Sequence, residues 1–166
     1  MAARAGRALV ATGSPGCARL LELQEYQGVG ELVRVTRAIE FSTSLRYWTS
    51  GLSDAENRER FGLEAERHGH NYRLEVTLRG DPDPVTGMVI NLSELKDVLE
   101  REIMARFDHK DLNDDTPYFE KTPPTPENFA IVIHQLLVEA LPADMLDRIR
   151  LHQDARLFVD VVEPLV

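Results

Sequence analysis

The chain has 166 residues, and its 19 Lys and Arg residues against 28 Asp and Glu residues give a formal net charge of −9 at pH 7. With 43% hydrophobic residues, this length suits one globular domain that buries its core without disulfides. The acidic balance disfavours nucleic acid and anionic membrane surfaces as partners, because both carry negative charge. Cys17 is the single cysteine, which excludes an internal disulfide and favours a cytoplasmic location.

Residues 1–30 are rich in Ala, Gly and Arg and have no clear period, so we expect a disordered N-terminal extension before a domain over residues 31–166. Apolar and polar side chains then alternate over residues 32–41, which predicts a half-buried strand. Residues 49–67 are polar and irregular, and we interpret them as a long loop.

A second strand is predicted over residues 71–79, and counting back by twos puts His70 and His68 on the same face as Tyr72. Apolar side chains at helical spacing predict one helix from Asn91 to Phe107. A second helix begins at the cap Thr125 and ends before Pro142, and short strands follow over residues 149–153 and 157–161. The predicted order is strand, strand, helix, helix, strand, strand, an α+β fold.

Two local patterns carry candidate chemistry. His68-Gly69-His70 on a strand projects two imidazoles to one side, which is half of a tetrahedral zinc site, although the pair could also be polar residues at a strand entrance. Asp108 beside His109 could orient an imidazole for proton transfer, but a helix C-terminus also favours His.

Further motifs occur in a fixed order along the chain. They are Phe41-Ser42-Thr43-Ser44, Leu52-Ser53-Asp54-Ala55-Glu56-Asn57 with Phe61-Gly62, His68-Gly69-His70-Asn71-Tyr72, Thr86-Gly87-Met88-Val89, Asp108-His109-Lys110-Asp111-Leu112-Asn113, and Thr125-Pro126-Glu127-Asn128. Over residues 33–161 this arrangement strongly resembles the 6-pyruvoyl-tetrahydropterin synthase and 6-carboxy-tetrahydropterin synthase family. The resemblance implies a tunnelling-fold (T-fold) subunit of order ββααββ: a four-stranded antiparallel sheet with two helices on one face. Three such subunits close a β-barrel, two trimers usually stack into a hexamer, and the active sites lie between subunits.

The resemblance also implies a chemistry. In the family a zinc ion held by three histidines polarises the side chain of dihydroneopterin triphosphate, while a cysteine and an Asp-His pair move protons. His68 and His70 match two zinc ligands, and Asp108 with His109 matches the proton relay. The stretch Thr125-Pro126-Glu127-Asn128 matches the part that helps to hold the pterin.

Three positions depart from the family pattern. Leu45 stands where the third zinc histidine is expected, Glu64 replaces the cysteine, and Gln153 replaces a glutamate that pairs with the pterin edge. Leu45 has no lone pair, so a two-histidine site needs another ligand to bind zinc well. Glu64 could act as the base, or it could complete a two-histidine, one-carboxylate site, in which case His109 would have to be the base.

The sequence therefore leaves three hypotheses. The first is a lyase or aldolase of this family that acts on a dihydroneopterin-like small molecule as a homo-oligomer, with Glu64 as base and the Asp108-His109 pair as relay. The second is the same fold adapted to a non-pterin substrate with weak or absent zinc, which the neutral amide of Gln153 would favour. The third is a non-catalytic relative.

Overall fold

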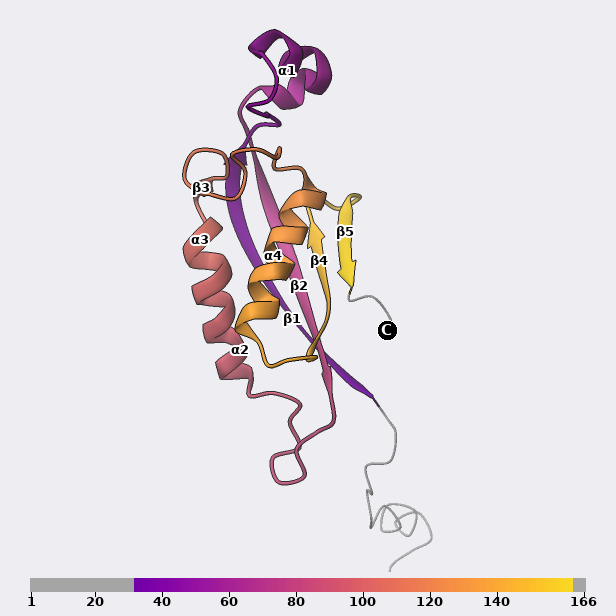
Figure 1. Ribbon diagram of the computed structural model, residues 1–166. Helices are drawn as coiled ribbons and strands as arrows, with labels where there is room; N and C mark the ends of the chain where they lie inside the picture. Colours follow the sequence, from indigo (N-terminus) through magenta and orange to yellow (C-terminus); the bar gives the residue numbers. More distant parts are fainter. Residues whose placement is uncertain (1–31, 163–166) are drawn as a thin grey trace, which may run out of the picture. The chain divides into compact units, whose positions relative to one another are not determined.

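The computed structural model of the chain describes residues 32–162, which form a five-stranded sheet with the helical segments 92–107 and 126–140 packed on one of its faces (Figure 1). The strand order is β3-β1-β2-β4-β5. Neighbouring strands run antiparallel except β1 and β3, which are parallel. The extension predicted over residues 1–30 lies outside the described residues.

Strands β1 (Val33–Leu45) and β2 (His68–Gly80) form a long antiparallel pair, and both are longer than predicted. The register runs from Val33 opposite Gly80 to Leu45 opposite His68. Directly opposite residues of an antiparallel pair point to the same face of the sheet. Buried Phe41 and Tyr72 are opposite each other on the face that the helices cover, so His68 and His70 also point to this face.

The connection between β1 and β2 contains helix α1 (Asp54–Phe61) and a 3-10 turn, η2 (Gly62–Ala65), so the prediction of an irregular loop there was wrong. Ser53 caps α1: its Oγ accepts from the Glu56 N–H, and the Glu56 carboxylate accepts from the Ser53 N–H at 2.8 Å. The helix has few apolar residues, which hid its period, and the cap stabilises it instead. Gly62, with φ of 57°, lets the chain turn from α1 into η2.

The two predicted helices are confirmed with small differences. The first consists of α2 (Leu92–Leu99), a π-helical turn (Glu100–Met104) and α3 (Ala105–Phe107), which follow one another directly. The second is α4 (Pro126–Ala140), whose cap Thr125 accepts from the Asn128 N–H. The last strands, β4 (Leu146–His152) and β5 (Phe158–Val162), are close to their predicted places.

The sheet has one strand more than the four that were predicted. The additional strand, β3 (Lys110–Asp111), pairs in parallel with Thr43 and Ser44 of β1. Two residues are too few to show an alternating pattern, so the sequence carried no signal for it. The strand fixes the segment after α3 beside β1, which positions Asp108 and His109.

The core lies between the helices and the sheet, and Phe129 of α4 is at its centre. Its ring makes edge contacts at centroid distances of 5.0–6.0 Å with four aromatic rings, those of Phe41, Tyr72, Phe107 and Phe119. Such edge-to-face pairs add to the stabilisation from burial. This aromatic cluster joins α4 to the strand that carries the two histidines.

Candidate active site

Glu64, His68 and His70 form a cluster where η2 leads into β2. Each offers one ligand atom, and these atoms all lie within 4.8 Å of one another. The Glu64 carboxylate is 2.9 Å from His68 Nε2, and the two imidazole rings are 5.0 Å apart. The predicted pairing of the two histidines on one face is thus present, with a carboxylate beside them.

Local hydrogen bonds hold this cluster. The carbonyl of Glu66 lies 2.8 Å from His68 Nδ1, and because a carbonyl only accepts, Nδ1 carries the proton and Nε2 is directed towards Glu64. The Tyr47 N–H donates to the Glu64 carbonyl at 2.7 Å, which anchors η2 to the end of β1. A Cβ on Gly69 would lie 3.3 Å from the Thr43 carbonyl, so glycine allows the close approach of the two strands here.

Leu45 lies directly opposite His68 and points to the same face, and it is 0% exposed. A histidine at this position would therefore present its ring beside that of His68. In this chain the position holds an apolar side chain that belongs to the core. Strands β1 and β2 together offer two imidazole ligands on this face.

Several polar atoms beside the histidines are buried and have no hydrogen-bond partner within residues 32–162. They are His70 Nε2, the Tyr72 hydroxyl and Thr43 Oγ1. Thr43 is directly opposite His70, and the Tyr72 ring is 5.7 Å from the His70 ring. Buried polar groups are normally satisfied, so this concentration of free donors and acceptors fits a place that receives a ligand.

The electrostatics of the site reflect burial and the Glu64 charge. Burial, and next the neighbouring His68, lower the pKa of His70. Burial, then the charges of Glu64 and Glu127, raise the pKa of Tyr47 to about 12. Burial also raises the pKa of Tyr72. At neutral pH the two tyrosines are therefore uncharged and can donate a hydrogen bond.

These side chains fit a zinc ion. Imidazole nitrogens and a carboxylate are common zinc ligands, and His70 Nε2 is buried with no partner in the described part of the chain. A set of two histidines and one carboxylate holds zinc in catalytic sites and leaves a position open for substrate or water. Sequence reasoning had not placed Tyr47 and Tyr72 in the site, although Tyr72 shares the alternation of His68 and His70.

Asp108 and His109 form a second group. His109 Nδ1 is 2.9 Å from the Asp108 carboxylate, and the His109 side chain is 83% exposed. The other Asp108 oxygen accepts from the Ser42 N–H at 3.0 Å, and this bond, together with His109, lowers the pKa of Asp108. His109 has φ of 56°, a left-handed conformation that is uncommon outside glycine and often marks functional positions.

The pair lies across β1 from the cluster. The His109 N–H donates to the Ser42 carbonyl, while the next residue of β1, Thr43, is opposite His70 on the other side. With neighbouring strands about 4.8 Å apart, two strand spacings separate the backbones of His109 and His70 by about 10 Å. Within one chain, the Asp108-His109 pair is therefore near the cluster, but no recorded interaction among residues 32–162 joins the two groups.

The three predicted substrate-binding residues lie at the start of α4 and directly after β4. Thr125 caps α4 with its side chain. Glu127, in the first turn of α4, is close enough to Tyr47 for its charge to raise that pKa. Gln153 follows β4, and its Oε1 is buried without a hydrogen-bond partner among residues 32–162.

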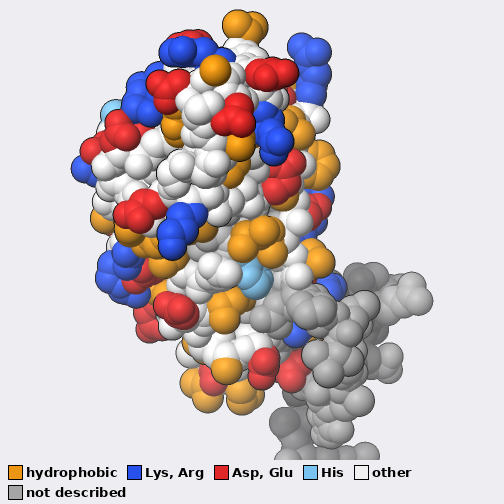
Figure 2. All heavy atoms as spheres, turned by 45° about the horizontal axis from the view of Figure 1, so that its top comes forward, with side chains coloured by type: hydrophobic (Ala, Val, Ile, Leu, Met, Phe, Trp, Pro, Cys, Tyr) orange, Lys and Arg blue, Asp and Glu red, His pale blue; other side chains and the backbone are white. Residues whose placement is uncertain are grey.

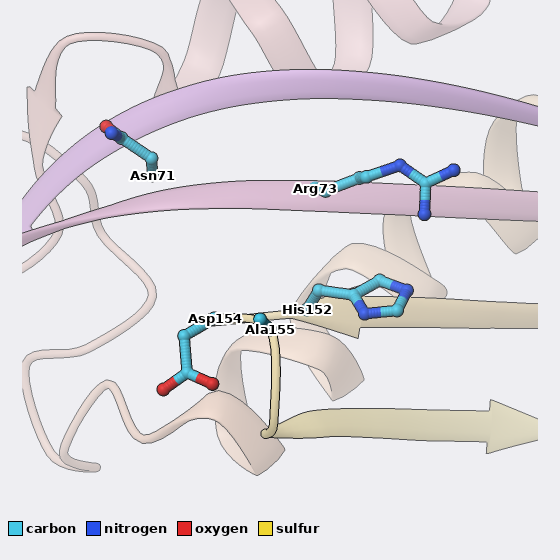
Figure 3. A pocket seen from close by; sticks show the side chains of 5 residues that line it. All are labelled: Asn71, Arg73, His152, Asp154 and Ala155. Carbon is cyan, nitrogen blue, oxygen red and sulfur yellow. The ribbon is translucent and has the colours of Figure 1, made fainter.

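A separate hollow of about 350 Å³ is lined by Asn71, Arg73, His152, Asp154 and Ala155 (Figure 3). Asn71 and Arg73 alternate along β2 with His70 and Tyr72, so this hollow opens on the face of the sheet opposite to the helices. On the face shown in Figure 2, acidic and basic side chains are interspersed and no large basic area is visible. Within the described residues, no helix is long and apolar enough to cross a membrane.

The fold and the site define a class of protein: an α+β domain with a cluster of side chains able to hold a metal ion at the start of one long strand and an Asp-His pair beside the neighbouring strand. The family model of 6-pyruvoyl tetrahydropterin synthase matches residues 34–163. The 6-pyruvoyl tetrahydrobiopterin synthase of Poecilia reticulata is 46% identical over 121 residues, which cover 72% of this chain and 82% of the relative. The human 6-pyruvoyl tetrahydrobiopterin synthase is 43% identical over 122 residues, which cover 72% of this chain and 84% of the relative.

Solved structures of this family show the same fold. The 6-pyruvoyl tetrahydropterin synthase of Caenorhabditis elegans has a TM-score of 0.75 at 32% identity, covering 81% of this chain and 97% of that one. The Plasmodium vivax enzyme has a TM-score of 0.59 at 14% identity, covering 82% of this chain and 100% of that one, and this likeness concerns the fold. The chain belongs to the 6-pyruvoyl tetrahydropterin synthase family and is an enzyme of that kind. The matches confirm the family and the pterin-directed lyase activity of the first hypothesis, and nothing in them favours the non-pterin or non-catalytic alternatives.

Proposed function

We propose that this enzyme is a lyase or aldolase that acts on the side chain of a dihydroneopterin-like substrate. The observation that carries the proposal is the Asp108-His109 pair, held in a left-handed conformation beside the strand pair that presents His68 and His70. Packing alone gives no reason to keep an exposed histidine in that conformation.

The relay works as an oriented base. The lowered pKa of Asp108 keeps its carboxylate ionised at neutral pH, so it accepts a hydrogen bond from His109 Nδ1–H and leaves Nε2 free to take a proton from substrate. Because the His109 side chain is 83% exposed, it can reach a substrate that lies between two subunits.

The substrate is held by other residues. Thr125, Glu127 and Gln153 would bind the pterin ring, and the amide of Gln153 would contribute one acceptor and one donor pair. A zinc ion bound by His68 and His70 with a further ligand would polarise the oxygens of the substrate side chain.

We further propose a cytoplasmic homo-oligomer, a trimer or a hexamer closed by a β-barrel. Its support is the pairing of the sheet edges: β5 has no outer neighbour among the described strands, and β3 covers Thr43 and Ser44 of β1. Long free edges favour pairing with another chain. The mass of the native protein in solution tests this assembly.

The activity is tested by incubating the purified chain with Zn²⁺ and 7,8-dihydroneopterin triphosphate and following the pterin products by chromatography. We expect consumption of the substrate, with loss or shortening of its side chain. Glu139→Gln, an exposed change near the end of α4, is the matched control and should keep the wild-type rate. A folded, zinc-supplied chain that leaves the substrate unchanged would refute the proposal.

A further inference from the structure

The cluster lacks the third imidazole for a structural reason. Leu45 is opposite His68, on the correct face, and is fully buried, so the ligand expected from the opposite strand is missing rather than displaced. Two imidazoles do not complete a zinc site, since protein zinc sites use at least three side-chain ligands. A third ligand in this subunit must come from another element.

Glu64 is the residue in position to supply it. Its Oε2 is 2.9 Å from His68 Nε2, and both atoms lie within 4.8 Å of the His70 ligand atom. Ligand atoms about 2.0–2.2 Å from a zinc ion can be this close to each other. The residue is also anchored, because the Tyr47 N–H donates to its carbonyl at 2.7 Å.

The hydrogen bonding turns His68 towards Glu64. The Glu66 carbonyl accepts a hydrogen bond from His68 Nδ1, so Nε2 is the ring nitrogen that faces the Glu64 carboxylate, 2.9 Å from Oε2. The neighbouring Tyr72 is 1% exposed, and its hydroxyl has no hydrogen-bond partner in residues 32–162, so a polar occupant of this space has a donor to meet.

We propose that Glu64 is the third metal ligand of a two-histidine, one-carboxylate zinc site, in place of the imidazole that Leu45 cannot supply. This inference rests on the proposed function, which gives a zinc ion at this site its role. It assigns Glu64 to the metal and leaves the role of base to His109, because a carboxylate bound to a cation is a weak proton acceptor. A carboxylate ligand also suits Mn²⁺ better than an imidazole does.

The test measures metal binding without substrate. The full chain is stripped of metal and titrated with Zn²⁺, and the visible spectrum of the Co²⁺-loaded protein reports the ligand set. We expect about one zinc per subunit in the wild type, and an affinity at least about 100-fold lower in Glu64→Gln, since even indirect contacts to a metal site change affinity 10–100-fold. Glu66→Gln makes the same change of charge two residues away, where the side chain pairs with Arg58, and should bind zinc as the wild type does.

A second variant strengthens the assignment. Adding Leu45→His to Glu64→Gln should recover zinc binding, because position 45 is opposite His68 on the same face. Wild-type zinc affinity and Co²⁺ spectrum in Glu64→Gln would overturn the proposal, most directly if that variant also lost turnover, because Glu64 would then be the base. Zinc bound through Glu64 by a chain that leaves the pterin unchanged would instead uphold the ligand and refute the proposed function.

Discussion

His109 offers the sharpest separation of catalysis from stability. Its side chain is 83% exposed and its recorded side-chain contact is with Asp108, so removing the imidazole opens no cavity. An exposed ion pair of this kind stabilises a protein by about 0–1 kcal/mol. The backbone matters more, because φ is 56° and a Cβ-bearing residue without a polar side chain is strained there.

The structure therefore predicts different stabilities for two variants with the same catalytic defect. Asn tolerates the left-handed conformation, so His109→Asn should unfold within about 1 °C of the wild type. His109→Ala should lose about 1 kcal/mol and about 3 °C in Tm. Neither side chain can carry a proton, so both variants should lower kcat by about 10²–10⁴-fold, equal to about 3–5 kcal/mol in the barrier.

Differential scanning fluorimetry and pterin chromatography on the same samples measure both effects, with native mass as a control for assembly. An unchanged kcat in His109→Asn would remove this residue from the mechanism. A loss of activity that paralleled a loss of Tm or of the oligomer would show that His109 has a structural role, and the argument from its exposure would fail.

Two predictions concern stability. Hydrogen bonds from Arg101 and, next in size, from Arg106 hold the pKa of Glu102 below its ordinary value. The stabilisation that these bonds give the folded protein is complete above the ordinary pKa of glutamate, and it is lost as the pH falls through the lowered pKa of Glu102. Glu102→Gln should thus cost about 1 kcal/mol in urea unfolding at neutral pH and nothing in strong acid, and a cost independent of pH would contradict this. Phe129→Ala should cost about 3–5 kcal/mol, because four aromatic rings pack around this side chain and its removal leaves a cavity among them. Phe129→Leu should be clearly milder, because leucine keeps most of the apolar volume; equal losses in the two variants would contradict this reasoning.

The sequence predicted those features whose signal is local. Alternation along β1 and β2 and the helical spacing in α2 and α4 were readable because each period lies within one segment. The cap Thr125 marked a helix start, and His68-Gly69-His70 implied two imidazoles on one face. Helix α1 was missed because its apolar residues are sparse, although Ser53 and Glu56 form a capping box.

The amino-acid sequence by itself determined which candidate ligands and proton carriers the chain offers and that position 45 offers none, since Leu45 has no donor atom whatever its surroundings. Only the tertiary structure decided how they meet. The register of β1 against β2 sets Leu45 opposite His68, and the turn through η2 brings Glu64 to 2.9 Å from that imidazole. Strand β3 is held beside β1 by only two residues, yet it positions His109. These contacts depend on strand register and on the path of a connection, which no local period encodes.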